Sequence, residues 1–425
     1  MKSVSFGRLR PGLFGLVALF IASLTPVSEA QTNAEILAEM GKMKARIAEL
    51  EAKLAATQQT ANEAEEKATA ATEAVQTVAT EAIQSAKSLE DLEGTLPPGE
   101  IPLAEEGWWN RTSLGGYGEM HLTLGDDEQI DFHRYVLFIN HQFNDFIRFV
   151  SEIELEHSIA GDGKNGEIEL EQAYVELDLG NGLAARGGMF LVPVGIINEY
   201  HEPPTFFGTE RNFIEREIIP STWWEGGVGV NKRFDNGLAL DLSVHSGLDV
   251  PTSGSNAYRI RSGRQKVSEA SASDWATTLN VEYNGIPGIG VGASAQYQSD
   301  ISQTTSSESN SAWFTEAHVD IQRGNWGLRS VYGRWDISGA SPALLGLATQ
   351  HGFYVEPSYT FTTGLGDLGF FARWSKLDSE SLDSDIYDVG LNFWPHERVV
   401  LKADYTKIQE AEDDDFINFG IGYQF

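Results

Sequence analysis

The 425-residue sequence contains no cysteine. This absence excludes a disulfide framework, a thiol nucleophile and thiolate metal ligands. Basic residues are also scarce, because 30 Lys and Arg stand against 62 Asp and Glu and leave a net charge of −32. Nucleic acid requires a basic surface. We therefore predict no nucleic-acid partner.

Long hydrophobic runs are nearly absent as well. The longest covers residues 12–24, follows three basic residues and precedes a small-x-small tripeptide at residues 28–30. A basic region, a short apolar region and such a tripeptide are typical of a secretory signal peptide. The apolar run is too short to span a bilayer comfortably. We predict that residues 1–30 are a signal peptide and that the mature chain has no transmembrane helix.

Signatures of catalysis are missing too. The sequence has no nucleophile elbow, no phosphate-binding loop and no dinucleotide fingerprint. Its nine histidines lack metal-ligand spacing, and two prolines directly follow His201 and Glu202, so this pair does not belong to a helical metal motif. We predict that the protein is not an enzyme, with no catalytic residue, no metal site and no cofactor.

Residues 31–94 are rich in Ala, Glu, Lys and Gln and contain no proline. A 3-4 spacing of mostly apolar residues continues from Ile36 to Leu92 without a change of register. This sustained periodicity predicts an α-helical coiled coil, and a single solvated helix is the alternative. A Gly- and Pro-containing linker, residues 95–110, follows and includes Trp108 and Trp109.

From residue 111 to residue 425 the pattern changes to period two, in runs of roughly ten residues. Short turns, such as residues 180–182 and 235–237, alternate without exception with longer connections, such as residues 158–165 and 248–273. An outer-membrane barrel shows this alternation because its periplasmic turns are short and its outer loops are long. We predict an all-β transmembrane antiparallel barrel of about 16 strands, apolar outside and polar within, with an N-terminal α-helical coiled coil.

The last residues of the chain support a membrane location. Phe419, Ile421, Tyr423 and Phe425 share one face of the final strand, and the chain stops on an aromatic residue. This arrangement resembles the C-terminal signal by which barrel proteins are recognised for insertion. We predict that the barrel lies in the bacterial outer membrane, with the coiled coil in the periplasm.

Charged residues alternate with apolar ones on several predicted strands, so we expect them to face the lumen. Two acidic triplets on neighbouring strands lie on one side of the wall, with arginines nearby. The expected pore-lining residues are Arg134, Arg148, Glu152, Glu154, Glu156, Glu167, Glu169, Glu171 and Arg186. They form either an electrostatic filter or a structural ion-pair network that anchors a loop to the wall, and both functions can coexist.

The connection at residues 192–222 is long, rich in proline and poor in small polar residues. Loops of this size usually have a function, so we predict that it folds into the barrel and narrows it; exposure at the surface is the alternative. Its expected constriction residues are His201, Glu202, Glu210, Arg211, Glu215, Arg216 and Glu217. The basic segment at residues 258–266 is expected in an outer loop as a solvated charge run.

Several segments resemble the phosphate-selective porin O and P superfamily. They are residues 131–138, 151–157, 166–177, 188–195, 198–202 and 218–229, within a resemblance that covers residues 108–425. The resemblance implies a sixteen-stranded trimeric porin whose inward-folded loop forms the constriction. The family's namesakes move anions along lumen arginines, whereas acids outnumber bases on the lumen face inferred for this sequence.

We therefore predict an outer-membrane porin that forms a water-filled channel for passive diffusion of small hydrophilic solutes or ions, with possible charge selectivity. The alternative is a structural tether between the outer membrane and the cell wall through the coiled coil. The expected partners are outer-membrane lipid, lipopolysaccharide, two further copies in a homotrimer and, through the coiled coil, peptidoglycan.

Overall fold

The structure, a computed structural model, describes residues 44, 108–125, 128–303, 308–378, 383–409 and 414–425. Apart from Lys44, these residues belong to the second of two units of the chain, Ala104–Phe425. The predicted signal peptide and coiled coil lie outside the described residues. None of the helices in the described ranges has the length and apolar character of a membrane span.

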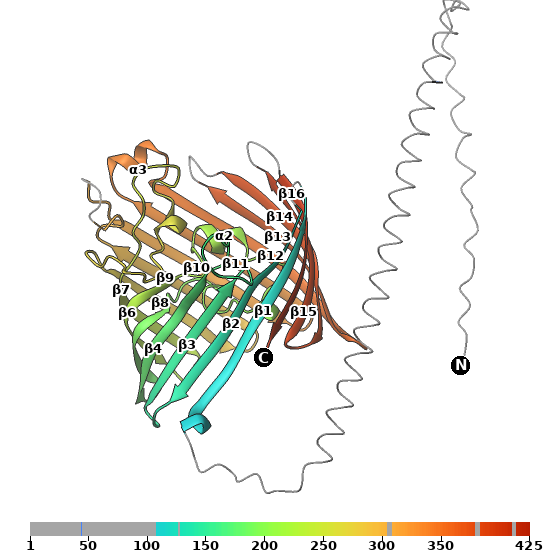
Figure 1. The fold of residues 1–425 in the computed structure, drawn as a ribbon, viewed down its shortest axis with the longest axis horizontal. Coiled ribbons are helices and arrows are strands. Elements are labelled where there is room, and N and C mark those ends of the chain that lie inside the picture. The colour runs from blue at the N-terminus through green and yellow to red at the C-terminus, as the bar shows by residue number, and fades with distance from the viewer. Residues whose placement is uncertain (1–43, 45–107, 126–127, 304–307, 379–382, 410–413) are drawn as a thin grey trace, which may run out of the picture. The chain divides into compact units, whose positions relative to one another are not determined.

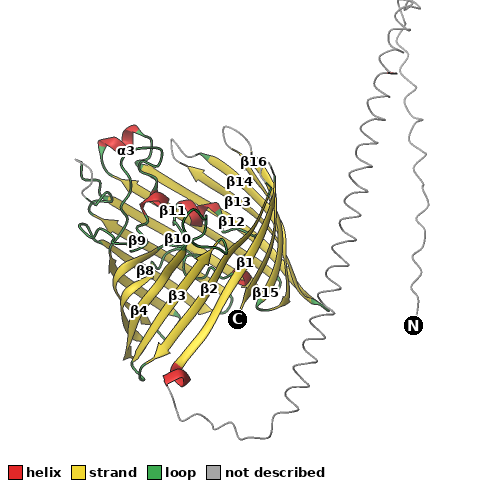
Figure 2. Cartoon of the chain, viewed as in Figure 1, coloured by secondary structure: helices red, strands yellow, loops and turns green. Residues whose placement is uncertain are grey.

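Sixteen antiparallel strands form a closed barrel, in which each strand pairs with its neighbours in sequence and β1 pairs with β16 (Figures 1 and 2). Closure satisfies the backbone groups that a sheet edge would leave unpaired. The strands are β1 (Thr112–Leu124), β2 (Gln129–Gln142), β3 (Ile147–Glu156), β4 (Ile168–Gly180), β5 (Leu183–Leu191), β6 (Trp224–Arg233), β7 (Leu238–His245), β8 (Ala276–Ile286), β9 (Ile289–Gln298), β10 (Ala312–Arg323), β11 (Trp326–Ile337), β12 (Thr349–Thr363), β13 (Gly366–Asp378), β14 (Ser384–His396), β15 (Val399–Gln409) and β16 (Asp414–Gln424).

From β3 onward the connections follow the predicted alternation of short turns and longer loops, whereas the β1–β2 and β2–β3 connections, residues 125–128 and 143–146, are equally short. The connections after even-numbered strands lie at one end of the barrel, the turn end, and those after odd-numbered strands lie at the other, the loop end (Figure 1). Five short helices complete the described elements: η1 (Trp108–Arg111), η2 (Pro203–Thr205), α2 (Phe213–Glu217), η3 (Ile260–Gly263) and α3 (Ala340–Leu344). The predicted barrel and its strand number are thus confirmed.

The outer face of the barrel is apolar, as the period-two pattern predicts. On β4, Ile168 is 69% exposed and points outward, whereas Glu171 is fully buried inside. Aromatic pairs lie at both ends of the wall: Tyr297 packs against Trp313 near the loop end, and Trp326 packs against Tyr359 near the turn end, with ring centroids 4.8 Å apart in each pair. Aromatic girdles flanking an apolar band are typical of membrane barrels.

The inner face is not polar throughout, and this part of the prediction was wrong. On β10, β11 and β12, large apolar side chains point inward and are buried, including Phe314, Trp335 and Tyr354. They form one hydrophobic core with Ile214 and Ile218 of the connection between β5 and β6. The inner wall is apolar here because the connection covers it and excludes water.

The connection between β7 and β8 also differs from expectation. Its basic segment is not a solvated charge run, because Tyr258 and Ile260 are buried and Arg261 and Arg264 contact the neighbouring loop. Arg261 Nη1 donates to the carbonyl oxygens of Arg216 and Ser221, both at 2.8 Å, and Arg264 Nη1 donates to another loop carbonyl at 2.7 Å. The segment braces the β5–β6 connection from the loop end.

Candidate functional site

The connection between β5 and β6, residues 192–223, is the central feature of the lumen, and we call it the inner loop. It carries η2 and α2, and α2 lies within the outline of the barrel (Figure 1). Its side chains and backbone contact inward-facing residues of strands on opposite sides of the wall, β1, β3 and β4 on one side and β11 to β15 on the other. This placement agrees with the predicted inward fold of residues 192–222.

Five consecutive backbone carbonyls of the inner loop are held by the wall, and we call residues 204–208 the strapped segment. Each carbonyl accepts one hydrogen bond from a side chain of β11, β13, β14 or β15. The pairs are Trp394 Nε1 to Pro204 (3.1 Å), Arg329 Nη1 to Thr205 (2.9 Å), Asn392 Nδ2 to Phe206 (3.0 Å), Arg373 Nη2 to Phe207 (2.7 Å) and Lys402 Nζ to Gly208 (2.7 Å). The segment comprises the end of η2 and the bend that follows it, and side chains of the wall supply the donors for its carbonyls.

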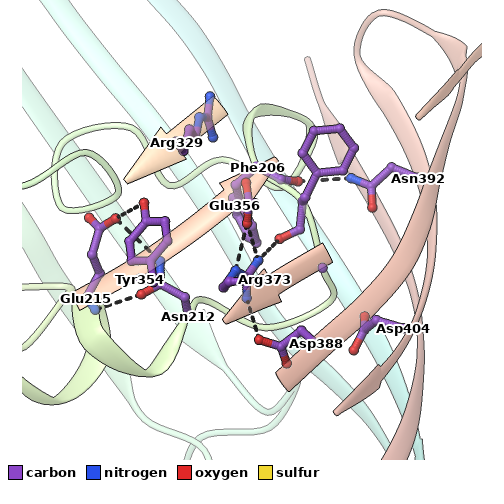
Figure 3. Close-up of polar contacts among 12 residues, drawn as sticks. Phe206, Asn212, Glu215, Arg329, Tyr354, Glu356, Arg373, Asp388, Asn392 and Asp404 are labelled. Carbon is purple, nitrogen blue, oxygen red and sulfur yellow. Dashed lines mark hydrogen bonds and ion pairs between the residues drawn. The ribbon is translucent and has the colours of Figure 1, made fainter. Parts of the chain in front are cut away.

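Arg373 is the centre of this attachment, as Figure 3 shows. Besides the loop carbonyl, its guanidinium contacts Glu356 of β12 at 2.7 Å and Asp388 of β14 at 3.3 Å. All three side chains are buried. A guanidinium offers five donors in a fixed plane, so one residue can satisfy two carboxylates and a backbone oxygen together.

A second attachment on the same side is made by Glu215, in α2 (Figure 3). Its Oε1 accepts from the Tyr354 hydroxyl at 2.8 Å, and its Oε2 accepts from the backbone N–H groups of Ile196 at 2.9 Å and Ile197 at 2.5 Å. Asn212 caps the helix, because its Oδ1 accepts from the Glu215 N–H at 2.9 Å. Glu215 therefore fixes the shape of the inner loop.

The opposite wall, formed by β1 to β4, meets the inner loop with carboxylates and histidines. Arg134 is buried and donates to Glu119 Oε1 at 2.5 Å. Glu152, Glu154 and Glu171 are all buried on the same side. The predicted acidic triplets thus do come together, but the inner loop covers these three members of the set.

His201 of the inner loop enters this acidic wall. Its Nε2 lies 3.6 Å from Glu152 Oε1 and 3.6 Å from Glu171 Oε2, and its Nδ1 lies 3.2 Å from the Asn198 carbonyl oxygen. Burial alone would lower the pKa of His201, but the two carboxylates outweigh it and raise the pKa to about 9.

Nearer the loop end, more histidines and acids gather on the same wall. His157 Nδ1 and His133 Nδ1 lie 2.8 Å and 3.3 Å from Asp131 Oδ2, and the rings of His121 and His133 stack with centroids 4.7 Å apart. His121 Nδ1 contacts Glu210 Oε1 at 2.8 Å. Burial would raise the pKa of Glu210, but His121 outweighs burial and lowers it.

The remaining predicted residues lie in less enclosed places. Lys266 of the β7–β8 connection contacts both Glu167, which precedes β4, and Glu169. Glu156 is half-buried beside them. In the inner loop, Arg211 donates to Thr222 Oγ1 at 2.5 Å and Arg216 pairs with its neighbour Glu217 at 2.9 Å, whereas Glu202 Oε2 is buried with no hydrogen-bond partner among the described residues.

Below the inner loop, at the turn end, lies a cavity of about 530 Å³. Its wall carries the predicted residues Arg148 and Arg186, which pair with Glu176 at 2.6 Å and Asp241 at 3.0 Å. Glu199 of the inner loop faces it from above. Burial raises the pKa of Glu199 to about 7, with Arg186 opposing the shift and Asp241 adding to it.

The sequence predictions missed the charged residues of the C-terminal strands. The principal ones are Arg329, Glu356, Arg373, Asp388, Lys402 and Asp404. Each occupies an inward-facing position of its strand, so the period-two alternation that predicted the acidic triplets would also have predicted these residues. Their role as donors and acceptors for the inner loop depends on contacts across 124 to 195 residues of sequence, for which the sequence contains no signal.

No known family model matches the chain. An uncharacterized protein of Aquifex aeolicus (strain VF5) is 28% identical over 349 residues, which make up 74% of this chain and 80% of that protein.

Several solved structures are similar to the barrel. The anion-selective porin from Comamonas acidovorans aligns with a TM-score of 0.52 at 11% identity, over 74% of this chain and 99% of that one. OmpF of Salmonella typhi, in complex with daunomycin, aligns with a TM-score of 0.51 at 14% identity, over 74% and 97%. A loop-deletion mutant of OmpT, an outer membrane protein of Vibrio cholerae, gives 0.50 at 11% identity, over 74% and 99%. At such identities the likeness concerns the fold, and the chain has the porin fold.

Proposed function

We propose that the protein is an outer-membrane porin, through which small hydrophilic solutes or ions diffuse passively. The observation that carries this proposal is the inner loop, which lies inside a closed sixteen-strand barrel above a cavity lined by charged side chains. A loop fixed across the lumen narrows the barrel without filling the turn end. Turn and loop ends then correspond to the periplasmic and outer sides of the membrane.

We propose a weak preference for cations. The cavity is lined by three arginines, Arg148, Arg186 and Arg233, by His318, which pairs with Glu282 at 3.1 Å, and by five acids, Glu176, Glu199, Asp241, Glu282 and Asp320. Acids lining a pore attract cations and repel anions. The half-buried Glu156 adds negative charge nearer the loop end, where Glu169 is paired with Lys266.

The resemblance to the phosphate-selective porin O and P superfamily is retained here for architecture rather than for selectivity. Arg134 and Arg373 are both buried and paired with carboxylates, so their charges are neutralised locally. We therefore do not expect a ladder of arginines that passes phosphate along the lumen. A homotrimer in contact with outer-membrane lipid and lipopolysaccharide remains our expectation for the assembly, and one of the similar solved structures is described as a trimer form.

Conductance of the purified protein in planar lipid bilayers tests this function. We expect stable single-channel steps and, in a KCl gradient, a reversal potential of the sign that indicates cation preference. A protein that migrates as a folded, heat-modifiable barrel but produces no conductance would refute the channel. Anion preference would refute the charge assignment alone. Neither result bears on the fold.

The predicted coiled coil at residues 31–94 supports a second role, a tether between the outer membrane and peptidoglycan. Deletion of residues 31–93 separates the two functions. A channel should keep its conductance after the deletion, whereas cells that lose a tether should show envelope defects such as detergent sensitivity. Normal envelopes in the deletion strain would reject the tether.

A further inference from the structure

Three residues at the contact between the inner loop and the β3–β4 wall are enclosed, and two of them, His201 and Glu171, are incompletely satisfied. Glu152, Glu171 and His201 are 2%, 0% and 3% exposed. His201 Nε2 and both carboxylate oxygens of Glu171 have no hydrogen-bond partner among the described residues. Buried polar atoms without partners are costly and rare, so such a cluster calls for a ligand.

The spacing of the three ligand atoms suits a metal ion better than a direct hydrogen bond. His201 Nε2 is 3.6 Å from each of the two carboxylate oxygens, beyond the usual hydrogen-bond range of about 2.7–3.2 Å. A tetrahedral ion with bonds of about 2.0–2.2 Å places its ligand atoms about 3.3–3.6 Å apart. All three atoms lie within 4.8 Å of one another.

The surroundings orient these groups as the outer partners of metal ligands do. The Nδ1 of His201 faces the Asn198 carbonyl oxygen at 3.2 Å, which favours the tautomer whose Nε2 carries the lone pair. Gln172 Nε2 donates to Glu152 Oε2 at 2.7 Å, while Glu152 Oε1 accepts from the Tyr117 hydroxyl at 3.4 Å and lies 3.6 Å from His201 Nε2. Ligating imidazoles and carboxylates are usually held by such outer hydrogen bonds.

The local charge also requires compensation. Arg134 gives its Nε to Glu119, and no described lysine or arginine forms an ion pair with Glu152, Glu154 or Glu171. Three buried carboxylates without a cation would repel one another strongly. This repulsion is relieved by a proton on His201 or on one of the carboxyl groups, or by a bound ion.

We propose that Glu152, Glu171 and His201 bind a divalent transition-metal ion of the zinc type, which fastens the inner loop to the β3–β4 wall. An imidazole nitrogen together with two carboxylates favours such ions over Ca²⁺ and Mg²⁺, which take oxygen ligands. Metal binding at this place does not depend on whether the barrel conducts.

Zinc content after refolding tests the site. Because the inner loop covers the ligands, the full chain is refolded with Zn²⁺ or with Ca²⁺, passed over a chelating column and analysed by mass spectrometry. We expect the wild type to retain one more equivalent of Zn²⁺ than His201→Gln and Glu171→Gln, with zinc affinity at least about tenfold weaker in both variants. Glu171→Gln is the safer variant, because this carboxylate accepts no hydrogen bond that its replacement would remove.

The matched control is His133→Gln, which removes a histidine from the separate cluster with Asp131 and His157. This variant should retain the zinc equivalent. Loss of zinc in His133→Gln but not in folded Glu171→Gln would place the ion in that other cluster and overturn the proposal. A wild type that retains no Zn²⁺ would also overturn it and assign the compensation of charge to protons within the cluster. Equal retention of Ca²⁺ would refute the class of ion.

Discussion

The two sides of the lumen hold the inner loop by different chemistry. On the β11–β15 side, apolar packing of Ile214 and Ile218 combines with five hydrogen bonds to the strapped segment. On the β1–β4 side, carboxylates and histidines face His201 and Glu210, and several buried atoms lack partners. The first side holds the loop through the chain's own packing and hydrogen bonds, and its unpartnered buried atoms, such as Asn392 Oδ1 and Ser375 Oγ, are neutral, whereas the second side depends on protons or ions. We therefore assign structural attachment to the first side and adjustable attachment to the second.

Substitution of Arg373 should weaken the attachment of the inner loop to the β11–β15 side more than any other change proposed here. Arg373→Met removes one strap and leaves Glu356 and Asp388 buried without their cation, which costs about 3–5 kcal/mol in comparable buried pairs. We expect increased hydrogen exchange in the inner loop and a larger, noisier conductance. Arg334→Met is the matched control, because Arg334 pairs with Asp336 on the exposed surface and should change stability by less than about 1 kcal/mol. Equal effects of the two substitutions would contradict the assignment.

Shortening Ile218 tests the apolar part of the same side. Ile218 is 1% exposed and packs in the core with Phe314 and Trp335, so Ile218→Ala should cost about 2–4 kcal/mol. We expect faster hydrogen exchange of the backbone amides in the inner loop of the folded barrel, while the amides of the strands keep their protection. Uniform loss of protection throughout the barrel would mean that the loop and the wall form one cooperative unit.

The smallest effect concerns Glu199, which belongs to neither attachment and faces the cavity at the turn end. Because its pKa is raised to about 7, Glu199 is mostly neutral below pH 7 and negatively charged above it. Cation preference should therefore increase as the pH rises from 6 to 8. Glu199→Gln should remove this change, and Glu128→Gln at the loop end should retain it. A pH-independent reversal potential in the wild type would reject Glu199 as a contributor.

The barrel itself was predictable because the alternation of apolar and polar residues that specifies it lies within each strand. Alternation such as Ile168, Glu169, Leu170 and Glu171 reflects lipid on one face of each strand, and short turns differ from loops in composition. The apolar inner wall was not predictable in this way. On β10, Trp313 faces outward and Phe314 faces inward. Both faces of this strand therefore carry aromatic residues, and the period-two alternation of apolar and polar residues is lost.

The candidate site was predictable only in part. The acidic triplets and His201 were expected in the lumen, but their burial beneath the inner loop depends on where that loop comes to rest. The same is true of the straps, in which Arg373 and Lys402 contact carbonyls 166 and 194 residues earlier in the chain. Such pairings follow from the closed tertiary structure rather than from local sequence.

The straps also constrain the order of assembly. Every side chain that holds residues 204–208 lies at least 124 residues later in the sequence, so the segment has no strap until the C-terminal strands are ordered. Contacts this distant in sequence form late, after the intervening chain has been ordered. The loop is therefore fixed across the lumen late in assembly, together with the pairing of β1 with β16, which joins residues still further apart in sequence.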